Sequence, residues 1–158
     1  MIEQGSPEWF AQRCGLATAS RFSAIITGTG KLSTSLDGYA AEMAADRFAG
    51  RALETWAGNA ATERGNELEG NARTYYELLN DVEVGIAEFV KLDNIDAGCS
   101  PDGYVGESGL IEIKCQLPKG HVQTLAYFKR NGTAPPDYIP QVQGQMWVTC
   151  LLYTSRCV

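Results

Sequence analysis

The chain has 158 residues, of which 44% are hydrophobic and 20% are charged, and 19 acidic against 13 basic side chains give a net charge of −6. This length suits one compact domain, and the apolar content excludes a chain that is disordered throughout. The sequence holds no run of 18 apolar residues and no signal peptide, so we expect a cytoplasmic protein. The acidic balance argues against a generic basic nucleic-acid coat.

Four helices are expected in the first half of the chain. They run from Ser6-Pro7 to Cys14, from Thr18 to Ile26, from Ser35 to Phe48 and from about Asn59 to Leu79. A capping serine and a first-turn proline begin the first helix, and glycines at positions 15, 28 and 50 end the first three. The fourth helix carries an apolar stripe that we assign to the core: Leu68, Ala72, Tyr75, Tyr76 and Leu79.

The periodicity changes to that of strands after Asn80. Short strands are expected over residues 82–86, 89–90, 95–99 and 110–115. Asp102-Gly103 is expected to form a hairpin turn between two of them. Two helices close the sequence, over about residues 119–129 and 138–149. Helices, a small and mostly antiparallel sheet, and helices again predict an α+β fold, in the form of an α/β sandwich.

Five cysteines and one histidine limit the metal and redox chemistry of the chain. The cysteines include no CxxC pair and are odd in number, so we expect ordinary thiols rather than a disulfide framework, a zinc site or an iron–sulfur cluster. The single histidine, His121, excludes multi-histidine zinc sites, and no motif for a Ser-His or Cys-His pair surrounds it. We expect it on the surface, near the start of a helix.

The most informative segment holds two acids and a lysine. Nine residues separate Asp102 from Glu112-Ile113-Lys114, so adjacent strands can bring both carboxylates to one end of a sheet. Because strand side chains alternate, Glu112 and Lys114 share a face while Ile113 points into the core. Two carboxylates and a backbone carbonyl suit Mg²⁺ or Mn²⁺, and a neighbouring ammonium orients water or stabilises a phosphoryl group. This is the layout of a metal-dependent phosphodiesterase, although a lone motif of this kind is more often a solvated hairpin.

Two other patterns favour the phosphodiesterase over the solvated hairpin, but only in combination with this motif. Glu69 and Arg73 are i,i+4 neighbours on the long helix, which by itself indicates a surface ion pair. Gln141 and Gln143 open the last helix with amides that can bind phosphate or position the lysine, although glutamine is also simply a good helix former.

Taken in order, the motifs resemble lambda exonuclease and the related YqaJ-type viral recombinases, which belong to the PD-(D/E)xK nuclease superfamily. Five motifs in the same order, over about residues 4–149, are far more specific than any one alone. They are Trp9…Arg13…Gly15…Thr18-Ala19-Ser20, Gly65-x-x-x-Glu69…Ala72-Arg73, Cys99-Ser100-Pro101-Asp102-Gly103, Glu112-Ile113-Lys114-Cys115 and Gln141-Val142-Gln143…Met146-Trp147-Val148-Thr149.

The resemblance implies a restriction-endonuclease-like core and a metal site in one nuclease domain over residues 1–158. Asp102 and Glu112 would be the central metal ligands, joined by the backbone carbonyl of Ile113 and, for one of two Mg²⁺ or Mn²⁺ ions, by Glu69. Lys114 would orient or deprotonate the attacking water. The resemblance also implies a group that holds a 5′-terminal phosphate, with Arg73 and Gln143 in support: Arg13, Ser20, Ser100 and Gln141.

The family reaction is processive 5′→3′ digestion of one strand of duplex DNA, which leaves a 3′ overhang for recombination. The resemblance thus implies DNA ends as substrate, a single-strand annealing protein as partner, a homotrimer, and the cytoplasm of a bacterial host that carries a phage or prophage. The chain departs from the family at its end, where residues 150–158 form an atypical tail. We expect a truncated C-terminus that exposes a sheet edge.

Two alternatives stay open: an endonuclease of the restriction or repair type on the same fold, and a non-catalytic DNA-binding or assembly module. The charge distribution favours a metal-dependent enzyme. Residues 53–112 carry 13 acidic and three basic side chains, whereas residues 113–158 carry one acidic and five basic. Acidity is thus concentrated in the segment that supplies the expected ligands, so we expect DNA binding to depend on a divalent metal.

Overall fold

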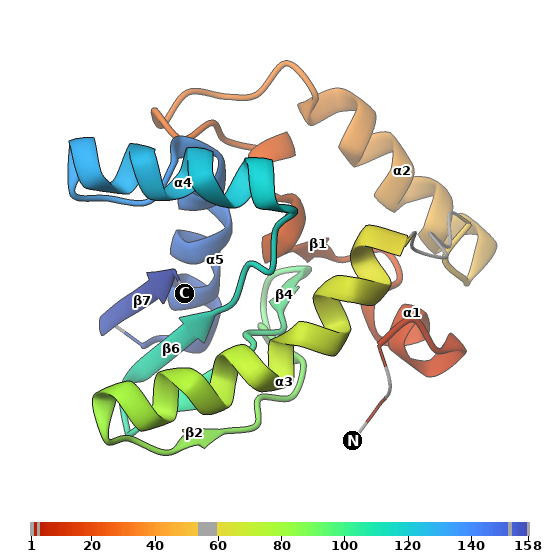
Figure 1. Cartoon of the computed structure of the whole chain (residues 1–158). Coiled ribbons are helices and arrows are strands. Elements are labelled where there is room, and N and C mark those ends of the chain that lie inside the picture. Colours follow the sequence, from red (N-terminus) through yellow and green to blue (C-terminus); the bar gives the residue numbers. More distant parts are fainter. Residues whose placement is uncertain (1, 3, 54–59, 152, 158) are drawn as a thin grey trace. The chain divides into compact units, whose positions relative to one another are not determined.

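The computed structural model describes the backbone of residues 2, 4–53, 60–151 and 153–157, and the side chains of these residues except 60–63, 66 and 153–157. The chain forms two compact units (Figure 1). The first unit combines residues 1–57, 88–100 and 136–150, and the second combines residues 58–87, 101–135 and 151–158. The mixed α+β class that the sequence predicts is confirmed, with one small sheet in each unit instead of a single sheet.

The first unit surrounds a three-stranded sheet with order β1-β4-β3, in which β1 and β4 are parallel and β3 and β4 are antiparallel. Its strands are β1 (Ala17–Thr18), β3 (Val90–Lys91) and β4 (Ala97–Cys99). Its helices are α1 (Pro7–Arg13), the 3₁₀ helix η1 (Ala19–Ala24), α2 (Leu36–Ala49), the 3₁₀ helix η2 (Pro136–Tyr138) and α5 (Ile139–Thr149).

Helix α5 forms the centre of the first unit's core. Its Val148 packs with Ala19 and Cys99, and Phe22 of η1 packs with Tyr39 of α2 in a neighbouring cluster. Gly144 lies directly against the ring of Phe22, so that a Cβ at this position would overlap the ring. The close approach of α5 to η1 thus depends on a residue without a side chain.

The second unit is built on a four-stranded sheet with order β2-β5-β6-β7. The pairs β2/β5 and β5/β6 are antiparallel, and β6/β7 is parallel. The strands are β2 (Val84–Gly85), β5 (Gly103–Val105), β6 (Gly109–Glu112) and β7 (Tyr153–Cys157), and the helices are α3 (Ala60–Asn80) and α4 (Pro118–Asn131). Ala72 and Tyr76 of α3 pack against a core cluster of Val84, Ile111 and Ile113, and Figure 1 shows α3 alongside this sheet.

Helices with strong local end signals lie where the sequence predicts them. The Ser6 hydroxyl accepts a hydrogen bond from the Trp9 N–H at the start of α1, with Pro7 as the first helical residue. Helix α2 ends at Gly50, which has a left-handed φ of 65°. Helices α4 and α5 are confirmed to within one residue at most ends, and His121 is exposed on α4.

Two local predictions are wrong because pairing across the sheets overrides them. The segment that begins at Thr18 is a two-residue strand followed by a short 3₁₀ helix, because Ala17 and Thr18 pair with β4. Asp102-Gly103 is not the hairpin turn: the Asp102 N–H bonds to the Ile111 carbonyl, and Gly103 already lies in β5. The turn falls at residues 106–108, where Gly106 has a φ of 60°.

The apolar stripe of the long helix is only partly buried. Ala72 and Tyr76 contact the core, but Tyr75 and Leu79 remain 60% and 66% exposed. Helical spacing identifies side chains that share a face, whereas burial depends on which neighbour covers that face.

The last residues join a sheet. The backbone of residues 153–157, which the sequence marks as an atypical tail, forms β7 and pairs with β6. None of the described helices is both long enough and apolar enough to cross a lipid bilayer.

Candidate active site

Asp102 is fixed across the gap between β5 and β6. Its N–H donates to the Ile111 carbonyl (3.2 Å), and its Oδ2 accepts a hydrogen bond from the Ile113 N–H (2.5 Å). These two bonds extend the strand pairing beyond Gly103, the first residue of β5. The carboxylate of Asp102 is therefore held beside the end of β6, where Glu112 lies.

The side chains of Glu112 and Lys114 lie side by side at the end of β6, as strand alternation predicts. Glu112 is 2% exposed, and its Oε1 lies 2.5 Å from Lys114 Nζ. Ile113, between them in sequence, is buried in the core of the second unit. The carboxylate of Glu112 is thus buried and paired with the ammonium of Lys114. This does not fit a solvated hairpin, which a lone motif of this kind usually indicates.

Helix α3 contributes Glu69 and Arg73. Arg73 Nη2 donates to Glu69 Oε1 (3.0 Å) and to the backbone carbonyl of Asp102 (2.8 Å). Arg73 therefore does more than form the surface ion pair that spacing alone indicates, because it also links the helix to Asp102, the residue just before β5. We call Glu69, Asp102 and Glu112, with Arg73 and Lys114, the carboxylate cluster.

The electrostatics of the cluster show an excess of negative charge around Asp102. Burial and the neighbouring carboxylates of Glu112 and Glu69 raise the pKa of Asp102 to about 7, against the opposing effects of the Ile113 N–H and of Lys114. Because burial and like charges both disfavour the ionised form of Asp102, an added cation near this carboxylate would lower its pKa. Such perturbed groups are typical of functional sites.

Three neighbours of the cluster are absent from the sequence-based prediction: Arg64, Gln116 and Thr124. Arg64 Nη1 donates to the Gln116 carbonyl (3.2 Å), and the Thr124 hydroxyl donates to Gln116 Oε1 (2.9 Å). These bonds fix the chain just after Lys114. Burial and the carboxylates of Glu69 and Asp102 raise the pKa of the Cys115 thiol, while Arg64 opposes them. No sequence signal distinguishes these residues from ordinary helix and loop positions.

The donor chemistry of the cluster fits Mg²⁺ or Mn²⁺. Its oxygens are hard ligands, and Mg²⁺ in proteins commonly takes one or two carboxylates and keeps several waters. Asp102, Glu112 and the Ile113 carbonyl supply such a set. Within the described part of the chain, no three His, Cys, Asp or Glu side chains are arranged to hold a metal together. Glu69 is paired with Arg73, and Glu112 with Lys114.

The first unit holds most of the residues that the sequence assigns to phosphate binding. Arg13 donates through Nη1 to the Trp9 carbonyl (2.9 Å) and through Nη2 to the Ser100 hydroxyl. Arg13 and Ser100 are thus brought together although 87 positions separate them in sequence. Gln141 is half-buried in the first turn of α5, and Gln143 is exposed on the same helix.

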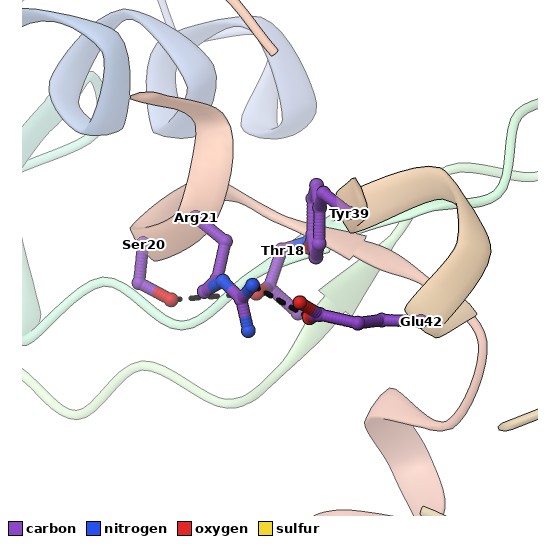
Figure 2. Close-up of polar contacts among 5 residues, drawn as sticks. All are labelled: Thr18, Ser20, Arg21, Tyr39 and Glu42. Atoms are coloured by element: carbon purple, nitrogen blue, oxygen red, sulfur yellow. Dashed lines mark hydrogen bonds and ion pairs between the residues drawn. The ribbon is translucent and has the colours of Figure 1, made fainter. Parts of the chain in front are cut away.

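Ser20 lies in a separate set of polar contacts (Figure 2). Its hydroxyl is 3.3 Å from the Thr18 hydroxyl, and the Thr18 N–H donates to the Tyr39 hydroxyl (3.1 Å). Arg21 lies over the Tyr39 ring and pairs with Glu42. Ser20 therefore contacts Thr18, and its side chain remains exposed.

Solved structures with a similar fold include an alkaline exonuclease, LHK-Exo, from Laribacter hongkongensis. One of its structures, described as a complex with dAMP, is 37% identical, covers 92% of this chain and 70% of its own, and has a TM-score of 0.76. A second structure of the same protein is 38% identical, covers 92% and 69%, and has the same TM-score.

A phage-related exonuclease from Haemophilus somnus shares 24% identity over 86% of this chain and 64% of its own. With a TM-score of 0.62, it supports the fold alone. The comparison with curated proteins gives no match. The family model described as the YqaJ-like viral recombinase domain matches residues 8–151. With that match over most of its length, the chain belongs to the YqaJ-like viral recombinase family, as its motifs predict.

Proposed function

We propose that the protein is a metal-dependent deoxyribonuclease that hydrolyses phosphodiester bonds from the ends of linear duplex DNA. The observation that carries this proposal is the carboxylate cluster, in which two acids and a lysine from adjacent strands meet an acid and an arginine from α3. The similar solved structures are described as exonucleases, which supports the same reaction.

In this proposal Asp102, Glu112 and the backbone carbonyl of Ile113 hold one Mg²⁺ or Mn²⁺ ion, and Glu69 contributes to a second. Bound ions of this kind activate water and stabilise negative charge on the attacking and leaving oxygens of an in-line displacement. Glu69 and Glu112 must then exchange their contacts with Arg73 and Lys114, at least in part, for contacts with the ions.

Lys114 and Arg73 have different tasks in this scheme. The ammonium of Lys114, released from Glu112, orients the attacking water or binds a non-bridging phosphate oxygen. Arg73 holds the backbone of Asp102 through a hydrogen bond to its carbonyl, so that the carboxylate keeps its position beside β6. Lys114 therefore acts on the reacting groups, whereas Arg73 acts through Asp102.

We further propose a 5′→3′ direction, which makes 3′ overhangs, with Arg13, Ser20, Ser100 and Gln141 as the group that binds the 5′-terminal phosphate and Gln143 in support. A guanidinium and neutral donors suit a phosphate ester. Family resemblance supports three additional proposals: a single-strand annealing protein as partner, a homotrimer as the assembled state, and the cytoplasm of a phage-carrying bacterium as the site of action.

The test is nucleotide release from linear duplex DNA with a 5′-phosphate, compared with 5′-hydroxyl duplex, single strands and a covalently closed circle. We expect Mg²⁺-dependent release from the linear duplex, fastest with the 5′-phosphate, and none in EDTA. Cleavage of the closed circle would instead establish an endonuclease. Duplex binding without any hydrolysis in Mg²⁺ or Mn²⁺ would establish a non-catalytic DNA-binding module.

A further inference from the structure

The guanidinium of Arg13 lies over two aromatic rings. Its guanidinium carbon is 3.8 Å from the ring centroid of Trp9, one turn earlier on α1, and 4.4 Å from that of Phe89, which precedes β3. Both rings are half-buried and belong to the same unit as Arg13. We call Trp9, Arg13 and Phe89 the arginine clamp. Contact with two rings limits the conformational freedom of the guanidinium.

Two hydrogen bonds further fix the orientation of the Arg13 guanidinium. Among the described residues, its acceptors are the Trp9 carbonyl and the Ser100 hydroxyl, one for each terminal nitrogen. A guanidinium has five N–H donors in a rigid fork, so donors remain for a further ligand. Both acceptors are neutral, which leaves the positive charge of Arg13 uncompensated by them.

Arg21 is a useful contrast within the same unit. Its guanidinium carbon also lies over an aromatic ring, 4.5 Å from the centroid of Tyr39, but its Nη2 is 2.6 Å from Glu42 (Figure 2). Within the described part of the chain, no ion pair includes Arg13. Burial lowers the pKa of Arg13 to about 10, which still leaves the side chain protonated at neutral pH. Among the described residues, Arg13 is therefore a cation of fixed orientation without a carboxylate partner.

We propose that Trp9 and Phe89 are positioning residues that hold the Arg13 fork ready for a terminal phosphate, and that they thereby set the preference for phosphorylated DNA ends. The inference rests on the proposed function, because the anion that Arg13 meets is the 5′-phosphate of the substrate. It goes beyond that function by assigning specificity to two apolar residues that do not touch the phosphate. A flexible arginine would lose rotamer entropy on binding, whereas the clamped arginine has lost it already.

The test compares kcat/KM on duplex ends that carry a 5′-phosphate or a 5′-hydroxyl. We expect Trp9→Leu and Phe89→Leu each to lower the phosphate-to-hydroxyl ratio by about 3- to 30-fold, the range of a cation–π contact. Trp9→Phe keeps a ring in place and should recover most of the ratio. Phe48→Leu is the matched control, since Phe48 is 98% exposed and should leave the ratio unchanged.

A double variant separates positioning from general destabilisation. If Trp9 acts through Arg13, then adding Trp9→Leu to Arg13→Ala should not lower the ratio further. Far-ultraviolet circular dichroism and thermal unfolding report whether each variant folds, and Phe89→Leu tests the clamp independently where Trp9→Leu does not fold.

The outcomes distinguish the clamp from the function on which it rests. An Arg13→Ala variant with a reduced ratio, alongside Trp9→Leu and Phe89→Leu variants with the normal ratio, would overturn the clamp and leave the exonuclease intact. A wild-type chain without nuclease activity, or an Arg13→Ala variant with an unchanged ratio, would overturn the assigned function or phosphate role itself.

Discussion

The two units of the chain differ in the sign of the charge at their candidate functional residues. In the second unit, three carboxylates lie near two cationic side chains, and burial together with the neighbouring carboxylates raises the pKa of Asp102 to about 7. In the first unit, Arg13 is held by aromatic rings and neutral oxygens. The second unit thus carries an excess of carboxylates at its candidate site, and the first carries a fixed cation. The metal-dependent enzyme that we propose, acting on a phosphorylated DNA end, would use both.

The largest effect should come from the carboxylate cluster. We expect Glu112→Gln to lower nucleotide release from linear duplex DNA at least about a thousandfold, because it removes a buried carboxylate of the proposed metal site and the partner of Lys114. Glu107→Gln is the matched control, since Glu107 is exposed at the turn of the same hairpin. Equal loss in both variants, measured as initial rates, would show that the hairpin and not the cluster is responsible.

The next largest effect should come from the arginine clamp. Arg13→Lys keeps the positive charge but loses the planar fork, so we expect the rate on 5′-phosphorylated ends to fall by about 10- to 100-fold. The rate on 5′-hydroxyl ends should change little. Arg21→Lys is the control, because Arg21 is already paired with Glu42. A uniform loss on both kinds of end would contradict a phosphate-specific role for Arg13.

The raised pKa of Asp102 predicts a pH-dependent stability. The folded chain binds this proton more tightly than the unfolded chain does, so stability is lost as pH rises from about 4 to about 7. Asp102→Asn removes that loss. We therefore expect the variant to be more stable than wild type by about 2–4 kcal/mol at pH 8 without metal, and by much less at pH 4. Urea unfolding at both pH values measures the difference, and an equal difference at both would refute it.

The smallest effects concern packing. Gly144→Ala places a Cβ against the Phe22 ring, so we expect a loss of about 1–3 kcal/mol in the free energy of unfolding. Gly120→Ala on α4 places its Cβ at an ordinary contact distance, 3.6 Å from Gln116, and should be neutral or stabilising by up to about 1 kcal/mol. Thermal unfolding compares them. Equal effects would mean that the first unit is not packed as tightly around α5 as described.

The elements that could be predicted from the sequence are those set by local chemistry. The Ser6 cap and Pro7 begin α1, and Gly50 ends α2, each by an interaction within a few residues. The charged members of the carboxylate cluster were also identifiable, because helical and strand periods place Glu69 beside Arg73 and Glu112 beside Lys114. These relations require no knowledge of the tertiary structure.

The features that the sequence did not predict correctly have a common physical cause. Asp102-Gly103 has the composition of a turn. However, hydrogen bonds of Asp102 with Ile111 and Ile113 extend the strand pairing at this point. The contact of Arg13 with Trp9 follows from helical spacing, whereas the contact with Phe89 joins segments that are far apart in sequence. Local composition does not encode which distant segment becomes a neighbour, and so two small sheets appeared where one was expected.

The central claim is that the carboxylate cluster binds the metal on which hydrolysis depends. Titration with Mn²⁺, followed by the electron paramagnetic resonance signal of the free ion, measures this binding without reference to activity. We predict that wild type and Glu107→Gln bind Mn²⁺ with equal affinity and that Glu112→Gln loses at least about tenfold in affinity. Equal Mn²⁺ binding by Glu112→Gln and wild type would contradict the account.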